Sequence, residues 1–270
     1  MEFIWPCLFA VFFWWFSTGI VLVIDRRVAM GPLGGRLASW GVFLLMMAIL
    51  VWCSGVATPQ AAYLGFMAAI ALWGWHELGF ISGRITGPKP EPCPEGAEGW
   101  TRFKAAVGTI LWHELAIAIT ALVLVALCLD GPNWVGVGTF VALWALRLST
   151  KINIFLGVPN MTVDLLPDQL GFLHSHFRKR PMNWLFPISV TVATVAGGWV
   201  AHGAFLTAAS EFEITASALV STLIVLGMIE HWFLVLPIPD AALWRWVPGV
   251  APRKQLNDRH TNQAQAEPAL

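Results

Sequence analysis

The sequence predicts an all-α, polytopic membrane protein with seven transmembrane helices. Of the 270 residues, 57% are hydrophobic and only 12% are charged, whereas a soluble domain carries about 25% charged residues. Apolar stretches of about 20 residues, enough to cross a bilayer as a helix, recur along nearly the whole chain. The 16 Lys and Arg residues fall only in or beside every second connection between these stretches. An even number of spans would break that segregation.

The first apolar segment is expected to be a true span. It lacks a preceding basic region and is long enough to cross the membrane, unlike a cleaved signal peptide. Tight turns at residues 58–60 and 130–133 join the second span to the third and the fourth to the fifth. The seven spans are expected at about 3–24, 37–57, 60–82, 105–129, 134–156, 184–207 and 214–237.

The basic residues predict the direction of the chain. They follow the first, third, fifth and seventh spans, whereas the other connections carry only acids such as Asp130, Glu211 and Glu213. Because basic residues stay on the cytoplasmic side, the N-terminus is expected outside and the C-terminus in the cytoplasm. Residues 1–249 would then form one membrane domain, followed by a flexible polar cytoplasmic tail at 250–270.

Two cytoplasmic loops are long. The first, about 83–104, contains the proline-rich run GPKPEPCPEG and has no helical potential. In the second, Leu166, Leu170, Leu173 and Phe177 recur at helical spacing before a basic cluster. This pattern predicts an amphipathic helix at 164–181 on the inner membrane surface, which could dock a partner or anionic lipid.

Three His/Glu pairs lie inside otherwise apolar spans: His76-Glu77, His113-Glu114 and Glu230-His231. Their distances in sequence from the cytoplasmic ends of their spans correspond to depths of roughly 9–14 Å at 1.5 Å per residue. The first two pairs occur in the same tetrapeptide, WHEL. Three helices are therefore expected to bring His and Glu to one level in the cytoplasmic leaflet.

Such a layer of ionisable groups must face the interior of the bundle. A carboxylate at the bilayer centre costs about 2.5–3.5 kcal/mol on insertion scales. One interpretation is a structural network in which polar pairs hold the helices together. The second is a mononuclear or dinuclear iron site; its candidate ligands are Glu77, His113, Glu114, Glu230 and His231.

The third interpretation is axial ligation of a tetrapyrrole iron or magnesium by a histidine. The candidates are His76, His113, His231 and, from the surface segment, His174. Deep tryptophans could stack on the ring; they are Trp14, Trp15, Trp73, Trp75, Trp112, Trp144 and Trp232. Against the iron site, adjacent His and Glu side chains point about 100° apart on a helix, unlike the Glu-x-x-His spacing of di-iron bundles.

Several polar and aromatic residues outside the three pairs are expected to pair charges or to lie at the membrane interface. Arg147 is expected to neutralise Glu114 or Glu230, and Lys151 to reach lipid phosphate. On an α-helical wheel His174 borders the apolar stripe of the surface segment, whereas His176 points away from it. Trp244 and Trp246 are expected to be anchors at the membrane interface.

Two longer motifs carry a family resemblance. The runs LRLSTKINIFLGVPN at 146–160 and HFRKRPMNWLFP at 176–187, with the two WHEL segments and IEHW, resemble the PuhE-type photosynthetic-complex assembly proteins of purple bacteria. The resemblance extends over nearly the whole chain. It implies an inner-membrane protein of phototrophic bacteria, encoded alongside reaction-centre genes, that helps to build the photosynthetic apparatus or to control bacteriochlorophyll supply. It implies no catalytic residues.

The residues and the resemblance together predict an integral membrane factor for photosynthetic complex assembly or bacteriochlorophyll supply. Its expected partners are the bilayer and either reaction-centre or antenna assembly components or bacteriochlorophyll-pathway proteins, with no nucleic acid. The alternative is a membrane-bound non-haem iron enzyme, a metal-dependent oxidoreductase acting on a tetrapyrrole intermediate.

Overall fold

The computed structural model describes residues 3–27, 33–160, 167–202, 210–237 and 243–247. Within these residues seven α-helices are long and apolar enough to cross a membrane, which confirms the predicted all-α, seven-helix fold. The helices are α1 Ile4–Arg27, α2 Leu33–Ser54, α3 Pro59–Ile81, α4 Gly99–Cys128, α5 Val135–Leu156, α6 Leu185–His202 and α7 Glu211–Phe233. A 3-10 helix, η1 Asp168–His176, lies between α5 and α6 in the chain. The predicted tail at 250–270 lies outside the described residues.

Polar residues at the helix starts explain several of these boundaries. The Thr58 hydroxyl accepts a hydrogen bond from the Ala61 amide, and Pro59 begins α3. Ser210 and Glu213 form a reciprocal capping box at the start of α7. The Asn183 side chain accepts hydrogen bonds from the first amides of α6. Each cap satisfies amides that have no partner inside the helix.

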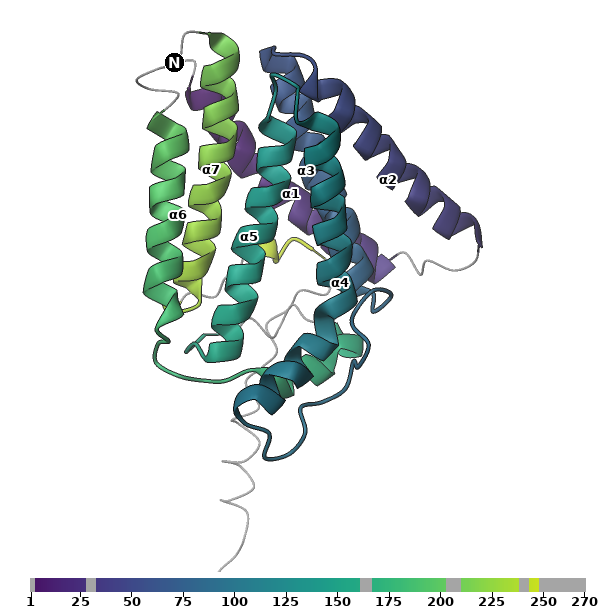
Figure 1. Cartoon of the computed structure of the whole chain (residues 1–270), viewed down its shortest axis with the longest axis vertical. Helices are drawn as coiled ribbons and strands as arrows, with labels where there is room; N and C mark the ends of the chain where they lie inside the picture. The colour runs from purple at the N-terminus through teal and green to yellow at the C-terminus, as the bar shows by residue number, and fades with distance from the viewer. Residues whose placement is uncertain (1–2, 28–32, 161–166, 203–209, 238–242, 248–270) are drawn as a thin grey trace, which may run out of the picture.

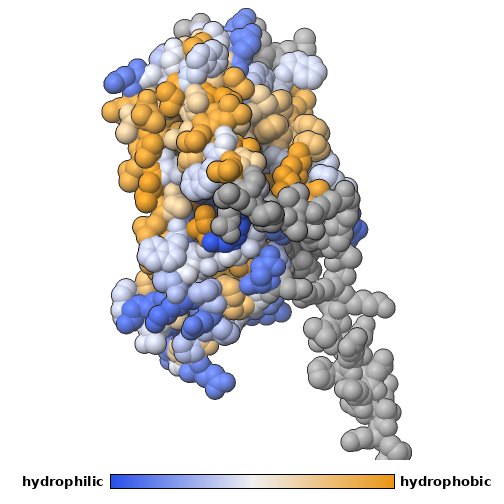
Figure 2. All heavy atoms as spheres, turned by 90° about the vertical axis from the view of Figure 1, so that its right-hand side faces the viewer, coloured by the Kyte–Doolittle hydropathy of each residue, from blue (hydrophilic) through white to orange (hydrophobic). Residues whose placement is uncertain are grey.

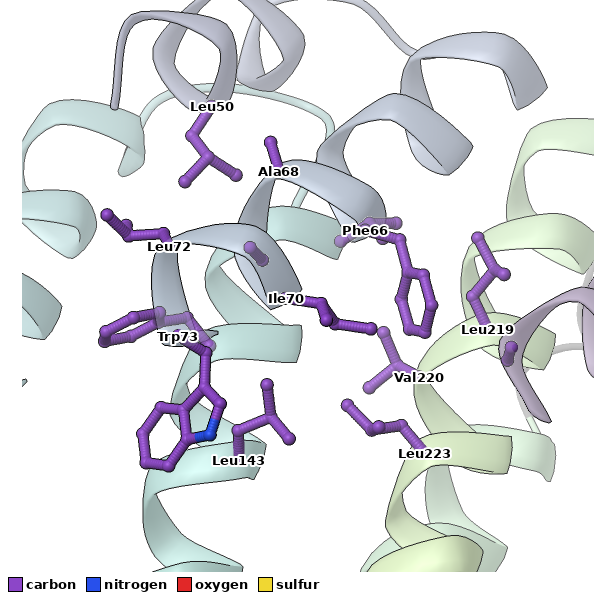
Figure 3. Packing of buried hydrophobic residues seen from close by; sticks show 14 of the residues in the cluster. Leu50, Phe66, Ala68, Ile70, Leu72, Trp73, Leu143, Leu219, Val220 and Leu223 are labelled. Atoms are coloured by element: carbon purple, nitrogen blue, oxygen red, sulfur yellow. The ribbon is translucent and has the colours of Figure 1, made fainter. Parts of the chain in front are cut away.

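Helices α3 and α7 form the centre of the bundle. In their most apolar windows 56% and 61% of the residues are buried, against 11% to 28% in the other five helices. Figure 3 shows Phe66 and Ile70 of α3 lying toward Leu219, Val220 and Leu223 of α7. Burial of these side chains supplies the packing that positions the polar residues further along both helices.

The remaining helices cover this central pair. Helix α6 packs mainly on α7, and α2 packs on α3 but leans away from the bundle toward its N-terminal end (Figure 1). Figure 2 shows an apolar belt across one face, with hydrophilic residues gathered below it. Exposed apolar side chains in such a belt suit contact with lipid.

The loop between α3 and α4 enters the packing of α4. The Lys89 amide donates to the Gly108 carbonyl over 2.9 Å, and the His113 amide donates to the Thr86 carbonyl over 2.9 Å. A Cβ on Gly87 would collide with the Gly108 carbonyl oxygen, so this crossing requires glycine. Helix α4 starts at Gly99, before the expected start near 105, and bends out of line toward this end in Figure 1. Groups from outside a helix that insert into its i→i−4 backbone hydrogen bonds are a recognised cause of such bends.

The predicted amphipathic α-helix at 164–181 is instead the 3-10 helix η1, and residues 161–166 lie outside the described part. A 3-10 helix has three residues per turn, so Leu170, Leu173 and His176 share its buried side. The leucines pack with Phe80 of α3. The α-helical wheel therefore placed the two histidines on the wrong sides of this segment: His174 is exposed and His176 is buried.

The segment 243–247 packs on α1. Trp244 is only 5% exposed, and its ring nitrogen donates to the Trp15 carbonyl. The Trp15 ring nitrogen in turn donates to the Leu243 carbonyl, and Trp246 stacks on Phe16. Trp244 is thus a buried packing residue rather than the interface anchor that its sequence position suggested.

Candidate functional site

Contacts between neighbouring helices link the three His/Glu pairs, the first two directly and the third through α5. Glu77 of α3 approaches His113 of α4, with 3.9 Å between Oε1 and Nε2. Lys151 Nζ of α5 lies 2.6 Å from Glu114 Oε1, and Trp144 donates to the other oxygen of that carboxylate over 3.2 Å.

The layer continues from α5 to α7. Arg147 Nη1 lies 3.7 Å from Glu230 Oε2, so Glu230 is the carboxylate beside this arginine, whereas Glu114 has Lys151. Lys151 therefore pairs inside the protein instead of reaching lipid phosphate. The charged layer therefore consists of several separate contacts rather than one cluster.

Two of the three histidines in the layer have polar partners on other helices. His76 is buried, and its Nε2 lies 3.1 Å from the Thr120 hydroxyl of α4. His231 is also buried, with Nδ1 2.7 Å from the Gly227 carbonyl oxygen and Nε2 2.9 Å from the Ser149 hydroxyl. Since a carbonyl only accepts, Nδ1 of His231 carries the proton and Nε2 accepts from Ser149.

His113 differs from the other two. Its side chain is fully buried and lies against the Phe80 ring, with 4.6 Å between ring centroids. Neither of its ring nitrogens has a hydrogen-bond partner among the described residues, and neither does the buried Oε1 of Glu77. Unpaired polar atoms at such depth are rare in folded proteins and call for a specific explanation.

The metal candidates do not converge on one point. Within the described part of the chain no three His, Cys, Asp or Glu residues are placed so that they could hold a metal ion together. Glu77 and His113 are the two predicted ligands that approach each other, with 3.9 Å between Oε1 and Nε2. A catalytic zinc site uses three protein ligands and a facial iron triad uses two histidines and a carboxylate.

A large cavity adjoins this layer, with a volume of about 710 Å³. It lies between the C-terminal half of α1 and the N-terminal half of α2 and reaches α3, α5 and α7. Ile20 of α1 and Val42 of α2 line it and are 39% and 47% exposed, so this part of the cavity wall reaches the surface of the protein. Its size is within the range of ligand sites, about 300–1,000 Å³.

The cavity wall is mostly apolar, with a few polar groups. Its charged residues are Glu77, Arg147 and Glu230, one from each of α3, α5 and α7. Trp14, Trp73 and Trp75 also line it. Part of the predicted charged layer and three of the predicted deep tryptophans therefore line one cavity. The predicted histidine ligands His76, His113, His174 and His231 are not among its lining residues.

Sequence reasoning missed the hydrogen-bond network behind His231. The Ser189 hydroxyl of α6 lies 2.9 Å from the Ser149 hydroxyl, and Asn153 Nδ2 donates to Ser189 over 3.0 Å. Asn183 Nδ2 donates in turn to the Asn153 carbonyl. The spacing of Ser149 and Asn153 by one helical turn was the available signal, since it places both on one face of α5.

The fold and this site define a polytopic, all-α membrane protein with an apolar cavity and a layer of ionisable groups at its wall. The chain belongs to the family described as "Protein of unknown function (DUF3623)", whose model matches residues 1–255. A relative from Rhodobacter capsulatus is 40% identical over 249 residues, or 89% of each chain. That relative is named as an uncharacterised 30.4 kDa protein in the puhA 5' region. No solved structure matches the chain.

Proposed function

We propose that this protein supports assembly of the photosynthetic complex by binding a tetrapyrrole of the bacteriochlorophyll supply within the membrane. The motifs shared with PuhE-type proteins suggest this role, and the name of the Rhodobacter capsulatus relative, in the puhA 5' region, agrees with the gene neighbourhood that they imply. The protein would act in the inner membrane of a phototrophic bacterium, beside reaction-centre or antenna assembly components or pathway enzymes.

The observation that carries the proposal is the cavity of about 710 Å³ that α1 and α2 line together with α3, α5 and α7. Tryptophans on its wall offer flat apolar surfaces to a planar ring. Its few charged groups can fix the orientation of a mostly apolar ligand. A hydrophobic pigment could reach such a cavity from the lipid without crossing water.

The cavity changes which residues are proposed to contact the ligand. Glu77, Glu230 and Arg147 line it, whereas the histidines contact neighbouring helices. The histidines would then support the wall, with His113 directly behind Glu77. The exposed basic residues Lys179 and Arg180, which follow η1, remain candidates for docking a partner or anionic lipid.

The alternative function is a non-haem iron enzyme acting on a tetrapyrrole intermediate. Glu77 and His113 are its best-placed ligand pair, and a third donor from the protein or substrate would have to complete the site. The separation of the remaining His and Glu residues favours the binding function over this one.

Two measurements test the proposed function. The first is purification of the full-length protein from phototrophically grown cells, with its absorption spectrum and metal content. We expect a chlorin-type spectrum at up to one pigment per chain; iron at one or two atoms per chain without pigment would favour the enzyme. The second is deletion of the gene in its host, with bacteriochlorophyll and reaction-centre levels as the readout. Normal levels of both after deletion would contradict the assembly function.

A further inference from the structure

Glu77 stands apart from the other two carboxylates of the polar layer. Glu114 has the Lys151 ammonium at 2.6 Å, and Glu230 has the Arg147 guanidinium at 3.7 Å. The ionisable neighbour that approaches Glu77 is His113, whose Nε2 is 3.9 Å from Oε1, beyond hydrogen-bond distance. Of the three carboxylates, Glu77 is thus the one that borders the cavity without a Lys or Arg ion pair in the described structure.

Glu77 and His113 together leave several buried polar atoms unsatisfied. Oε1 of Glu77 and both ring nitrogens of His113 have no hydrogen-bond partner in the described part of the chain, and His113 is 0% exposed. The amide of His113 is held from outside its own helix, by the Thr86 carbonyl. This hydrogen bond fixes the backbone of His113 beside Glu77, whose own side chain lines the cavity.

The donor count decides what kind of ligand fits. One carboxylate and one imidazole are fewer protein ligands than a free zinc ion or a facial iron triad takes, since these use three or four. They are sufficient for a metal that already has four ligands of its own, as in a tetrapyrrole ring. Carboxylate oxygen is a suitable ligand for magnesium and zinc. Trp73 lines the cavity one helical turn before Glu77, where its ring can lie beside a macrocycle.

We propose that Glu77 is the axial ligand of the metal in a tetrapyrrole bound in the cavity, and that His113 positions the Glu77 carboxylate. This inference rests on the proposed function, because it takes the cavity as a tetrapyrrole site. The metal gains a fifth ligand from Glu77 and no bond is broken. With the ring bound, His113 would move its Nε2–H from 3.9 Å to hydrogen-bond distance of the ligating carboxylate, as residues behind metal ligands commonly do. The ligand class is therefore a metallated tetrapyrrole rather than a metal-free one.

The test compares zinc pheophorbide a with metal-free pheophorbide a on the purified full-length protein in lipid nanodiscs. We expect the wild type to bind the zinc compound at least about tenfold more tightly, with a shift of the absorption bands that reports axial ligation. In Glu77→Gln the preference for zinc is lost, while the metal-free compound binds as before. In Glu77→His an imidazole replaces the carboxylate, so the preference returns with a different band position.

Matched variants separate ligation from general damage. Glu114→Gln removes a carboxylate at the same level that does not line the cavity, and it should keep the zinc preference. His113→Gln should reduce the preference for zinc by no more than Glu77→Gln does and should change the band shift, but leave metal-free binding unchanged. Equal loss of both compounds would instead assign His113 a purely structural role and overturn its positioning role.

The outcomes distinguish the two proposals. If the wild type binds neither compound, the tetrapyrrole function fails, and the axial ligand with it. If it binds both compounds equally tightly, or if Glu77→Gln retains the zinc preference, Glu77 is not the axial ligand although the cavity still takes the ring. If Glu77→Gln does not fold, the wild-type comparison and Glu77→His still decide the matter.

Discussion

At the scale of single residues, Ser149 links three helices through one hydroxyl group. It donates to Nε2 of His231 on α7 and lies 2.9 Å from the Ser189 hydroxyl on α6. His231 is fixed in the tautomer that accepts this bond, because its Nδ1 donates to the Gly227 carbonyl. The hydroxyl therefore satisfies a buried acceptor that has no other described partner.

Ser149→Ala should lower the free energy of unfolding by about 1–3 kcal/mol, because it leaves Nε2 of His231 buried without a partner. The measurement is equilibrium unfolding in detergent, followed by tryptophan fluorescence. Ser54→Ala is the control, since the Ser54 hydroxyl donates only to the Val51 carbonyl of its own helix. An equal loss in both variants would contradict the importance of the network.

At the scale of elements, the loop after α3 is built into α4 at Gly87. A Cβ there would meet backbone atoms of Gly108, Thr109 and Ile110, which cannot yield as a flexible side chain can. Gly87→Ala should therefore displace the loop and lower the free energy of unfolding by about 1–3 kcal/mol, as overpacking does. Thermal unfolding and limited proteolysis of residues 83–98 are the measurements. Gly171→Ala is the control, because a Cβ there meets nothing within 4 Å.

Arg102 ties the start of α4 to two other elements. Its Nη2 donates to the Phe155 carbonyl at the end of α5 over 2.7 Å and to the His176 carbonyl at the end of η1 over 2.6 Å. The guanidinium also lies 3.9 Å from the centroid of the Phe155 ring. The side chain is only 6% exposed, so both carbonyls depend on it.

Arg102→Lys should fail to replace this contact, because the ammonium group ends a side chain one bond shorter than the path to Nη2 and offers no planar group to lie over the Phe155 ring. We expect a loss of about 1.5–3 kcal/mol for a charged hydrogen-bond donor and faster proteolysis of the loop at 83–98. Lys104→Arg, a neighbouring exchange of the same two residue types at an exposed position, is the control. Wild-type protease resistance in Arg102→Lys would contradict the assignment.

The same elements show how far the sequence predicts the structure. Hydropathy predicts the seven helices, because their length and composition follow from crossing a bilayer. The rise per residue predicts a common level for the His/Glu pairs, and the structure adds the contacts that link them between neighbouring helices. Rotation of each helix follows from packing instead, so the sequence could not assign Glu114 to Lys151 or Glu77 to the cavity. The buried side of η1 was predicted wrongly because a 3-10 helix has three residues per turn. The burial of Trp244 was not predicted, because tertiary packing decides whether a tryptophan lies at the membrane interface or in the core.

At the scale of the whole molecule, the cavity and the charged layer lie toward one end of the bundle. The charged residues on its wall occur in the C-terminal halves of α3, α5 and α7. The positive-inside rule assigns that end to the cytoplasm. A ligand bound there would be close to the side on which pigment precursors are made, and the orientation of the chain therefore bears directly on the proposed function.

The orientation predicts which loops a membrane-impermeant maleimide can reach. Cys93 lies in the loop between α3 and α4, and Ala57 is exposed in the turn between α2 and α3, at the opposite end of α3. With the other cysteines replaced by serine, Cys93 should react in inverted membrane vesicles and not in spheroplasts. Ala57→Cys, in a chain with Cys93 also replaced by serine, should react in spheroplasts and not in inverted vesicles. The reverse pattern would place the cavity's charged residues in the outer leaflet, and the ligand would then have to be supplied from the periplasmic side.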